Sequence, residues 1–244
     1  MTAIEEVARR LQDRADTLPV ALEHRKVFLD TYRRTTLAVG VAVDEARFED
    51  PDWVAVWDVR FAELYLDAHD ADLAGARVPR PWRLAFDAPA DLPALRHVLL
   101  GINAHVNYDL PQSLLAVITD EQFTDQVLMD RRRRDHERID GVLASRVAAE
   151  DSELKSTGVA SVVDRALTPL NRLGTRRFLR EARLKVWHNT VELQQARLAG
   201  PSAYQSRLAE LEVLGAARIA DLLAPGQVLL RLAVAGFGVV LPPL

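Results

Sequence analysis

Apolar residues recur at three- and four-residue intervals along nearly the whole chain, and this spacing limits its fold more than any other feature. The first run, with Ile4, Val7 and Leu11 on one helical face, stops at Pro19. Later runs repeat the pattern between prolines and glycines, and strand-like alternation is confined to at most the last dozen residues. No internal repeat or low-complexity linker divides the 244 residues. The sequence therefore predicts an all-α, single-domain bundle of about eight helices over residues 1–244.

Breaker and capping residues predict where the helices begin and end. Asp50 before Pro51 has the character of an N-cap followed by proline at the first helical position. The segment 75–93 holds four prolines and is expected to form a crossing loop with at most one helical turn. Pro111 is expected to kink the central helix or to end it. The expected helices cover about residues 4–18, 20–37, 51–65, 91–118, 121–147, 152–167, 176–198 and 204–223.

Composition and charge exclude several classes of function. The chain has 31 basic and 35 acidic residues and a formal charge of -4, so it offers no basic field for binding nucleic acid. It has no cysteine, which excludes disulfides, thiolate zinc sites and a cysteine nucleophile. The first residues lack an apolar signal-like stretch, and the longest apolar run, 228–241, is too short to span a bilayer. We expect a cytoplasmic protein without a membrane span that takes a small-molecule substrate, and the oligomeric state is left open.

The most unusual segment runs from Leu100 to Pro111 and reads Leu-Gly-Ile-Asn-Ala-His-Val-Asn-Tyr-Asp-Leu-Pro. A helical stretch that carries two His, two Asn, a Tyr and an Asp beside Leu-Leu-Gly-Ile is expected to lie in the interior, where each buried polar group needs a partner. Gly101 costs about 1 kcal/mol of helix propensity relative to alanine, and it indicates close approach by a neighbouring helix or a ligand. On a helix the polar side divides into two rows, one with His97, Gly101, His105 and Asp109 and the other with Asn103 and Asn107.

A metal centre is one interpretation of these rows. A histidine and a carboxylate four residues apart on one helix, such as His105 and Asp109, can bind the same divalent ion. The sequence offers further donors at this spacing or near it: His136 with Asp140, His188 with Glu192, and Asp67 with His69.

Each of these residues also has an ordinary structural interpretation. His105 and Asp109 could equally belong to a buried hydrogen-bond network. His136 follows four consecutive arginines, 131–134, and such a run usually marks a solvated face with ion pairs. His188 follows a tryptophan and is more often an ordinary contact between helices.

Four stretches of the sequence resemble an uncharacterised family of helical proteins that is common in actinobacteria and is known as a domain of unknown function. The resemblance extends over most of the chain and brings no activity with it. The stretches are Phe61–Tyr65, Arg80–Phe86, Leu99–Pro111 and Asp135–Asp140.

A shorter stretch, Leu100–Asp109, is similar to the Leu-Gly-x-x-x-His-x-x-x-Asp helix of zinc-dependent phospholipases C and the related single-strand nucleases. Those enzymes are all-helical, of about this size, and hold a cluster of zinc ions. The similarity implies that His105 and Asp109 are metal ligands, with His136 and Asp140 as the nearest match to a second pair. This chain lacks the N-terminal tryptophan and the histidine-rich loop of those enzymes, so at most one or two divalent ions, zinc first, are expected.

The sequence thus favours a metal-dependent, hydrolase-like enzyme, in which the metal activates a bound water and polarises a phosphoryl or carbonyl oxygen. Asn103 and Asn107 would orient the ligands or the substrate. Arg133 or Arg134 would neutralise developing charge, and Tyr108 would contact the substrate. Two alternatives stay open: a non-catalytic binding or scaffold protein with a buried Asn-His-Asp network, and a metal-free enzyme with an apolar cavity beside the central histidine.

Overall fold

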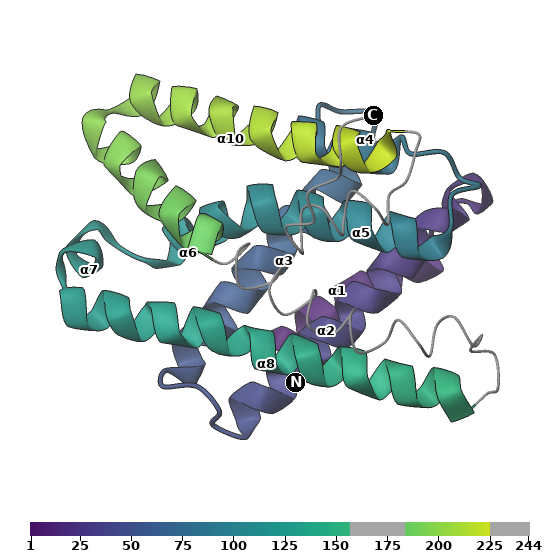
Figure 1. The fold of residues 1–244 in the computed structure, drawn as a ribbon, viewed down its shortest axis with the longest axis horizontal. Helices are drawn as coiled ribbons and strands as arrows, with labels where there is room; N and C mark the ends of the chain where they lie inside the picture. Colours follow the sequence, from purple (N-terminus) through teal and green to yellow (C-terminus); the bar gives the residue numbers. More distant parts are fainter. Residues whose placement is uncertain (157–183, 225–244) are drawn as a thin grey trace, which may run out of the picture.

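The computed structural model describes residues 1–156 and 184–224, and every regular element in these two ranges is helical (Figure 1). This confirms the predicted all-α fold and helical bundle. The elements in chain order are α1 (Ala3–Asp16), the 3-10 helix η1 (Val20–Arg25), α2 (Lys26–Asp44), α3 (Pro51–Leu73), α4 (Arg80–Phe86), α5 (Ala94–Ala104), the π-helix η2 (His105–Asp109), α6 (Leu110–Val117), α7 (Asp120–Thr124), α8 (Gln126–Ser156), a helix over residues 184–199, and α10 (Pro201–Leu223).

Side chains at the helix starts explain why several helices begin where they do. The Thr2 hydroxyl accepts from the Glu5 backbone N–H while the Glu5 carboxylate accepts from Thr2 N, a capping box that opens α1. The Asp50 carboxylate accepts from the Trp53 N–H at 3.2 Å, and Pro51 follows at the first position of α3. The N-cap predicted at Asp50 is therefore confirmed.

The central helix, formed by α5, η2 and α6, lies between two long helices (Figure 1). Helix α10 packs along α4 and α5 on one side of it, and α8 lies on the other side in contact with α2. Helices α1, α2 and α3 pack on one another and complete the bundle. This arrangement buries the polar rows of the central helix.

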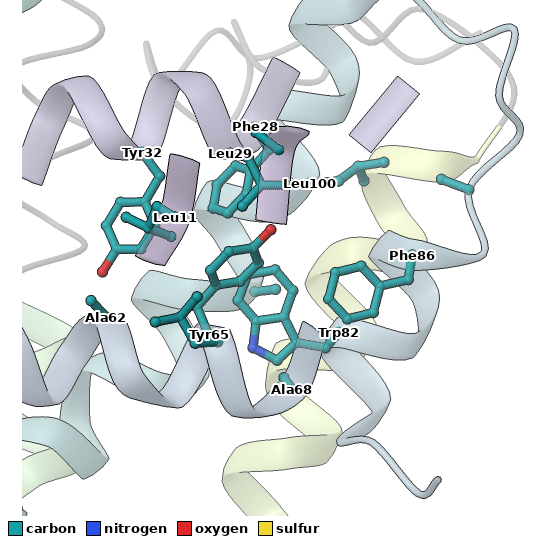
Figure 2. Packing of buried hydrophobic residues seen from close by; sticks show 14 of the residues in the cluster. Leu11, Phe28, Leu29, Tyr32, Ala62, Tyr65, Ala68, Trp82, Phe86 and Leu100 are labelled. Carbon is teal, nitrogen blue, oxygen red and sulfur yellow. The ribbon is translucent and has the colours of Figure 1, made fainter. Parts of the chain in front are cut away.

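The main hydrophobic core is rich in aromatic rings. Figure 2 shows rings from α2, α3 and α4 pointing toward one another. The Tyr65 ring centroid lies 5.1 Å from that of Phe28 and 5.0 Å from that of Trp82, and Phe86 stacks on Trp82 at 5.2 Å. Rings at these separations and tilts stabilise one another beyond the area that they bury.

Gly101 on α5 is required by this aromatic core. A Cβ atom at this position would lie 2.3 Å from the Phe28 ring, much closer than non-bonded carbon atoms can approach. The predicted close approach at Gly101 is therefore confirmed, and the neighbour is an aromatic ring of α2.

Several helix boundaries differ from the prediction. Helices α2 and α3 run on to Asp44 and Leu73, beyond the expected ends near residues 37 and 65. Two further differences have a local cause. Helix α4 has seven residues, about two turns instead of at most one, because Pro81 lies in its first turn, where a missing N–H does no harm. Helix α8 runs unbroken through the interruption expected between 147 and 152, since that stretch contains no proline or glycine. The predictions for residues 157–183 and 225–244, the late alternation among them, lie outside the described residues.

Within the two described ranges, no helix combines the length and the apolar character that crossing a membrane would need.

Candidate functional site

The central helix changes its winding where the polar rows meet. Residues His105–Asp109 form a π turn, and the Leu110 N–H donates to the carbonyl oxygen five residues earlier, that of His105. In a regular helix the Pro111 ring would collide with the carbonyl oxygen of Asn107. The wider turn relieves this conflict, and α6 continues to Val117. The interruption predicted at Pro111 thus occurs one turn earlier, as a π turn, which is a feature frequent at functional sites.

His105 and Asp109 form a buried hydrogen-bonded pair across this turn. The Nδ1 atom of His105 lies 2.8 Å from Oδ2 of Asp109, and Trp82 Nε1–H of α4 donates to the same oxygen at 2.7 Å. An oxygen that accepts two hydrogen bonds leaves the donor role to the imidazole, so His105 carries its proton on Nδ1. Its Nε2 is then an acceptor.

Burial determines the charge state of the pair. Desolvation lowers the pKa of His105, although the hydrogen bond and charge of Asp109 oppose the shift. Desolvation likewise raises the pKa of Asp109, while the bonds from His105 and Trp82 pull it down. The imidazole is therefore neutral near pH 7, and no arginine or lysine contributes to either shift.

Aromatic rings enclose the His105 imidazole. Phe61 of α3 stacks on it face to face, with ring centroids 3.5 Å apart and an interplanar angle of 7°. Tyr32 of α2 meets it edge-on at 4.7 Å, and Trp82 and Tyr65 lie at 5.7 and 6.1 Å. We call this set of five residues, His105 with its four aromatic neighbours, the aromatic enclosure.

Two buried polar atoms of the enclosure, and a third on the same helix as Phe61, have no hydrogen-bond partner in the described part of the chain. They are Nε2 of His105, the hydroxyl oxygen of Tyr32 and Oδ2 of Asp58. Asp58 lies on α3 one turn before Phe61, and burial raises its pKa to about 7. Burial and the charges of Asp58 and Asp109 raise the pKa of the Tyr32 hydroxyl.

The other predicted metal ligands are placed apart from the central pair. Asp67 is exposed, whereas His69 is fully buried on another face of α3, with Nδ1 3.3 Å from an oxygen of Asp70. His136 is buried between the rings of Trp57 and Trp187, whose centroids lie 5.5 and 5.8 Å from that of the imidazole.

The remaining predicted pairs add no ligands to the centre. The side chain of Asp140 lies outside the described residues. His188 is exposed, which does not support the contact between helices expected for it, and Glu192 is half-buried.

The central donors do not fit a zinc site. Asp109 Oδ2 already accepts two N–H groups, and the pair with His105 faces inward, each member toward the other. Among the side chains that the structure describes, no three or more histidines and carboxylates gather around a common point. Zinc binding stays a prediction that elemental analysis can test.

The asparagine row bonds to its own helix. Asn103 Nδ2 donates to the carbonyl oxygen of Leu99 at 2.8 Å, and Asn107 Nδ2 donates to the Asn103 side-chain oxygen at 3.2 Å. Neither bond reaches the His105–Asp109 pair, so the predicted orienting role of the asparagines has no contact that supports it.

Three predicted substrate-binding residues lie away from the aromatic enclosure. Tyr108 packs with Leu193 and Leu211 in a separate apolar cluster. Arg133 and Arg134 are exposed on α8, where they form ion pairs within the surface. The solvated-face interpretation of the arginine run describes these two residues correctly.

Two other residues of the same stretch are buried and were not predicted to matter. The Arg132 guanidinium lies 4.5 Å from the Trp53 ring centroid and donates to Asp50, the N-cap of α3. Asp135 is fully buried and accepts from the backbone N–H groups of Glu49 and Asp50 at 2.7 and 2.8 Å. We call these contacts between α8 and the loop before α3 the α8 anchor.

Sequence reasoning also missed Tyr32 and Trp82, which contact the central pair, and Asp58, whose charge acts on Tyr32. One signal was present for Asp58, because it occupies the helical face of α3 that carries Val54, Ala62 and other buried residues. No signal marked the other two, since their roles depend on contacts between separate helices.

Comparisons with known proteins place the chain in a family. No curated protein and no solved structure matches it significantly. A family model matches residues 4–225, which is most of the chain and includes the whole candidate site. This model describes DUF5995, a family of unknown function. The chain therefore belongs to the DUF5995 family.

Proposed function

We propose that the protein binds a small organic molecule beside His105 and uses the neutral imidazole as a proton acceptor, without a metal ion. One observation carries the proposal: the Asp109 bond holds the proton on Nδ1 and leaves the buried Nε2 with no hydrogen-bond partner among the described residues. A histidine oriented in this way by a carboxylate has the arrangement that general bases require.

The chemistry of the enclosure supports a proton-acceptor role. If a ligand transfers a proton to Nε2, the imidazolium that forms lies 2.8 Å from the Asp109 carboxylate, which stabilises its charge. The aromatic walls favour a ligand with an apolar or aromatic body and at least one N–H or O–H group. A carboxylate oxygen already bonded to two N–H groups is a poor ligand for a metal, and this favours the metal-free route.

The free-energy cost of burying polar atoms without hydrogen bonds also supports a ligand at this position. A buried polar atom without a hydrogen bond destabilises a fold by about 1–3 kcal/mol. Unpartnered atoms on His105, on its ring neighbour Tyr32 and on Asp58, whose charge acts on Tyr32, support a ligand or bound water that supplies their hydrogen bonds.

The second candidate function is a structural role for the His105–Asp109 pair. The hydrogen bond from Trp82 favours this role. Trp82 Nε1–H of α4 donates to Asp109 of η2 at 2.7 Å, and so fastens a short helix to the central one. In this alternative a buried water satisfies Nε2 of His105, and no ligand binds.

The two candidates differ in what a small probe does. We expect benzyl alcohol, an aromatic ring with one O–H donor, to bind saturably and to shift the ¹⁵N resonance of His105 Nε2 in NMR spectra. Toluene, which lacks the donor, is expected to bind more weakly. The variant His105→Phe keeps the ring contacts and is expected to lose the preference for the alcohol, whereas His188→Phe, on an exposed histidine, leaves it unchanged.

The absence of saturable binding, together with an unchanged Nε2 resonance, would overturn the proposal in favour of the structural role. One equivalent of zinc per chain, measured by elemental analysis on protein purified without a metal-binding tag, would favour the metal-dependent enzyme instead.

A further inference from the structure

Asp58 is a buried carboxylate that no basic side chain neutralises. Its Oδ2 has no hydrogen-bond partner within the described residues, and its side chain is almost wholly buried. Desolvation alone accounts for the shift of its pKa to about 7, with no contribution from an arginine, lysine or histidine. An isolated buried carboxylate is strongly disfavoured unless a cation pairs with it.

The buried arginines in the described part of the chain donate hydrogen bonds to groups other than Asp58. Among the residues that the structure describes, Arg25 and Arg132 are the buried arginines. Arg25 donates to Asp72 at 2.6 Å and to the Phe86 carbonyl oxygen at 3.0 Å. Arg132 donates to Asp50 in the α8 anchor. Neither guanidinium is available to Asp58.

The walls next to Asp58 are suited to a positive charge. Tyr32 contacts both Phe61 and Tyr65 edge-on, with ring centroids 6.1 and 5.8 Å apart. The faces of such rings attract ammonium groups, most strongly where water is excluded. The charges that act on the Tyr32 hydroxyl are those of the carboxylates Asp58 and Asp109.

We propose that the ligand of the aromatic enclosure is a small primary amine bound as its ammonium ion, which pairs with Asp58 and donates to Nε2 of His105. This rests on the proposed function, and it specifies the class of ligand. The ammonium group supplies the cation and the N–H donors that the enclosure lacks, and the aromatic rings surround its apolar body.

Benzylamine and benzyl alcohol form a matched pair of probes, because they share size and shape and differ in charge. Calorimetry is carried out at pH 8, where Asp58 is ionised and benzylamine is protonated. We expect benzylamine to bind at least about tenfold more tightly than benzyl alcohol. At pH 5.5 the preference should shrink because Asp58 takes up a proton. The other titratable groups at the enclosure or bonded to it are Tyr32, Tyr65, His105 and Asp109, and they act on both probes in the wild type.

The variant Asp58→Asn keeps the shape of the side chain and removes its charge. We expect it to abolish the preference for benzylamine while benzyl alcohol still binds. Asp67→Asn, on an exposed carboxylate of the same helix, is the matched control and should change neither affinity. If Asp58→Asn does not fold, the pH dependence of benzylamine binding to the wild type decides the question.

Each outcome separates the two proposals. Equal affinities for both probes, unaffected by Asp58→Asn or by pH, would overturn the amine assignment and leave the proposed function intact. Failure of both probes to bind would overturn the proposed function and the amine assignment together.

Discussion

Two buried carboxylates of this protein, Asp135 in the α8 anchor and Asp109 in the central helix, have contrasting surroundings. Both oxygens of Asp135 are bonded, to the N–H groups of Glu49 and Asp50 and to the Arg138 guanidinium at 2.9 Å. Asp109 accepts two hydrogen bonds from neutral aromatic N–H groups, both on the same oxygen. The Asp135 network contains a cation, whereas the Asp109 network leads to the unpartnered Nε2 of His105.

The difference teaches which buried polar groups indicate function. Asp135 connects the loop before α3 to α8, and its satisfied oxygens account for its burial as a structural contact. The pair formed by Asp109 and His105 leaves an acceptor for another molecule. Burial of a polar residue is therefore weaker grounds for a site than an unsatisfied atom at the end of its network.

The largest expected effect tests the unsatisfied region. The pKa of Asp58 is raised from 3.8 to about 7 in the folded state, so the folded protein holds this proton more tightly than the unfolded chain. The carboxyl group therefore destabilises the fold increasingly as the pH rises from about 4 to 7. Asp58→Asn should remove this penalty and gain roughly 4 kcal/mol relative to the wild type between pH 4 and pH 8.

Urea unfolding of both proteins at several pH values measures this gain. His105 has a lowered pKa and so acts in the opposite direction, with stability lost as the pH falls below 6.5, but it does so in both proteins. If the free energies of unfolding of the two proteins differ by the same amount at every pH between 4 and 8, Asp58 has a partner in the folded state. That result would remove the contrast with Asp135.

The next effect tests the hydrogen bonds of Asp135. Asp135→Ala removes the acceptor of two backbone N–H groups and of the Arg138 guanidinium, and we expect the free energy of unfolding to fall by about 3 kcal/mol. Chemical denaturation gives the loss, and binding of benzyl alcohol to the folded fraction should be unchanged. Impaired binding at full stability would show that the α8 anchor is part of the site.

A smaller effect is expected at Gly101, which lies against the Phe28 ring of the aromatic core. In Gly101→Ala the new methyl group must displace the Phe28 ring, which packs against Tyr65 and Trp82, at a loss of about 2 kcal/mol. Thermal unfolding measures the loss. Gly141→Ala, at a helical glycine with open space around it, is the matched control and should be neutral or slightly stabilising.

The smallest effect is expected at the surface of the α8 anchor. Arg134→Ala removes an exposed ion pair with Glu49 and should change the free energy of unfolding by less than about 1 kcal/mol. Denaturation at low and high salt checks this value. A loss as large as that of Asp135→Ala would show that the exposed and buried parts of the anchor act as one unit.

Much of the fold follows from local patterns. The apolar periodicity predicted an all-helical bundle, and Asp50 before Pro51 marked the start of α3, because caps and helical faces depend on residues a few positions apart. The pairing of His105 with Asp109 was open to prediction for the same reason. Pro111 indicated an interruption but not its form, because the choice between a kink and a π turn depends on the packing around the helix.

The central segment shows how much the sequence by itself determines about the candidate site. It determined that a histidine and a carboxylate share one turn of a buried helix. Only the tertiary structure placed Trp82 on the carboxylate and Phe61 on the imidazole, and left the buried oxygen of Asp58 without a partner. These residues lie on other helices, far away in the chain, and their contacts depend on how the helices pack, which no local spacing encodes.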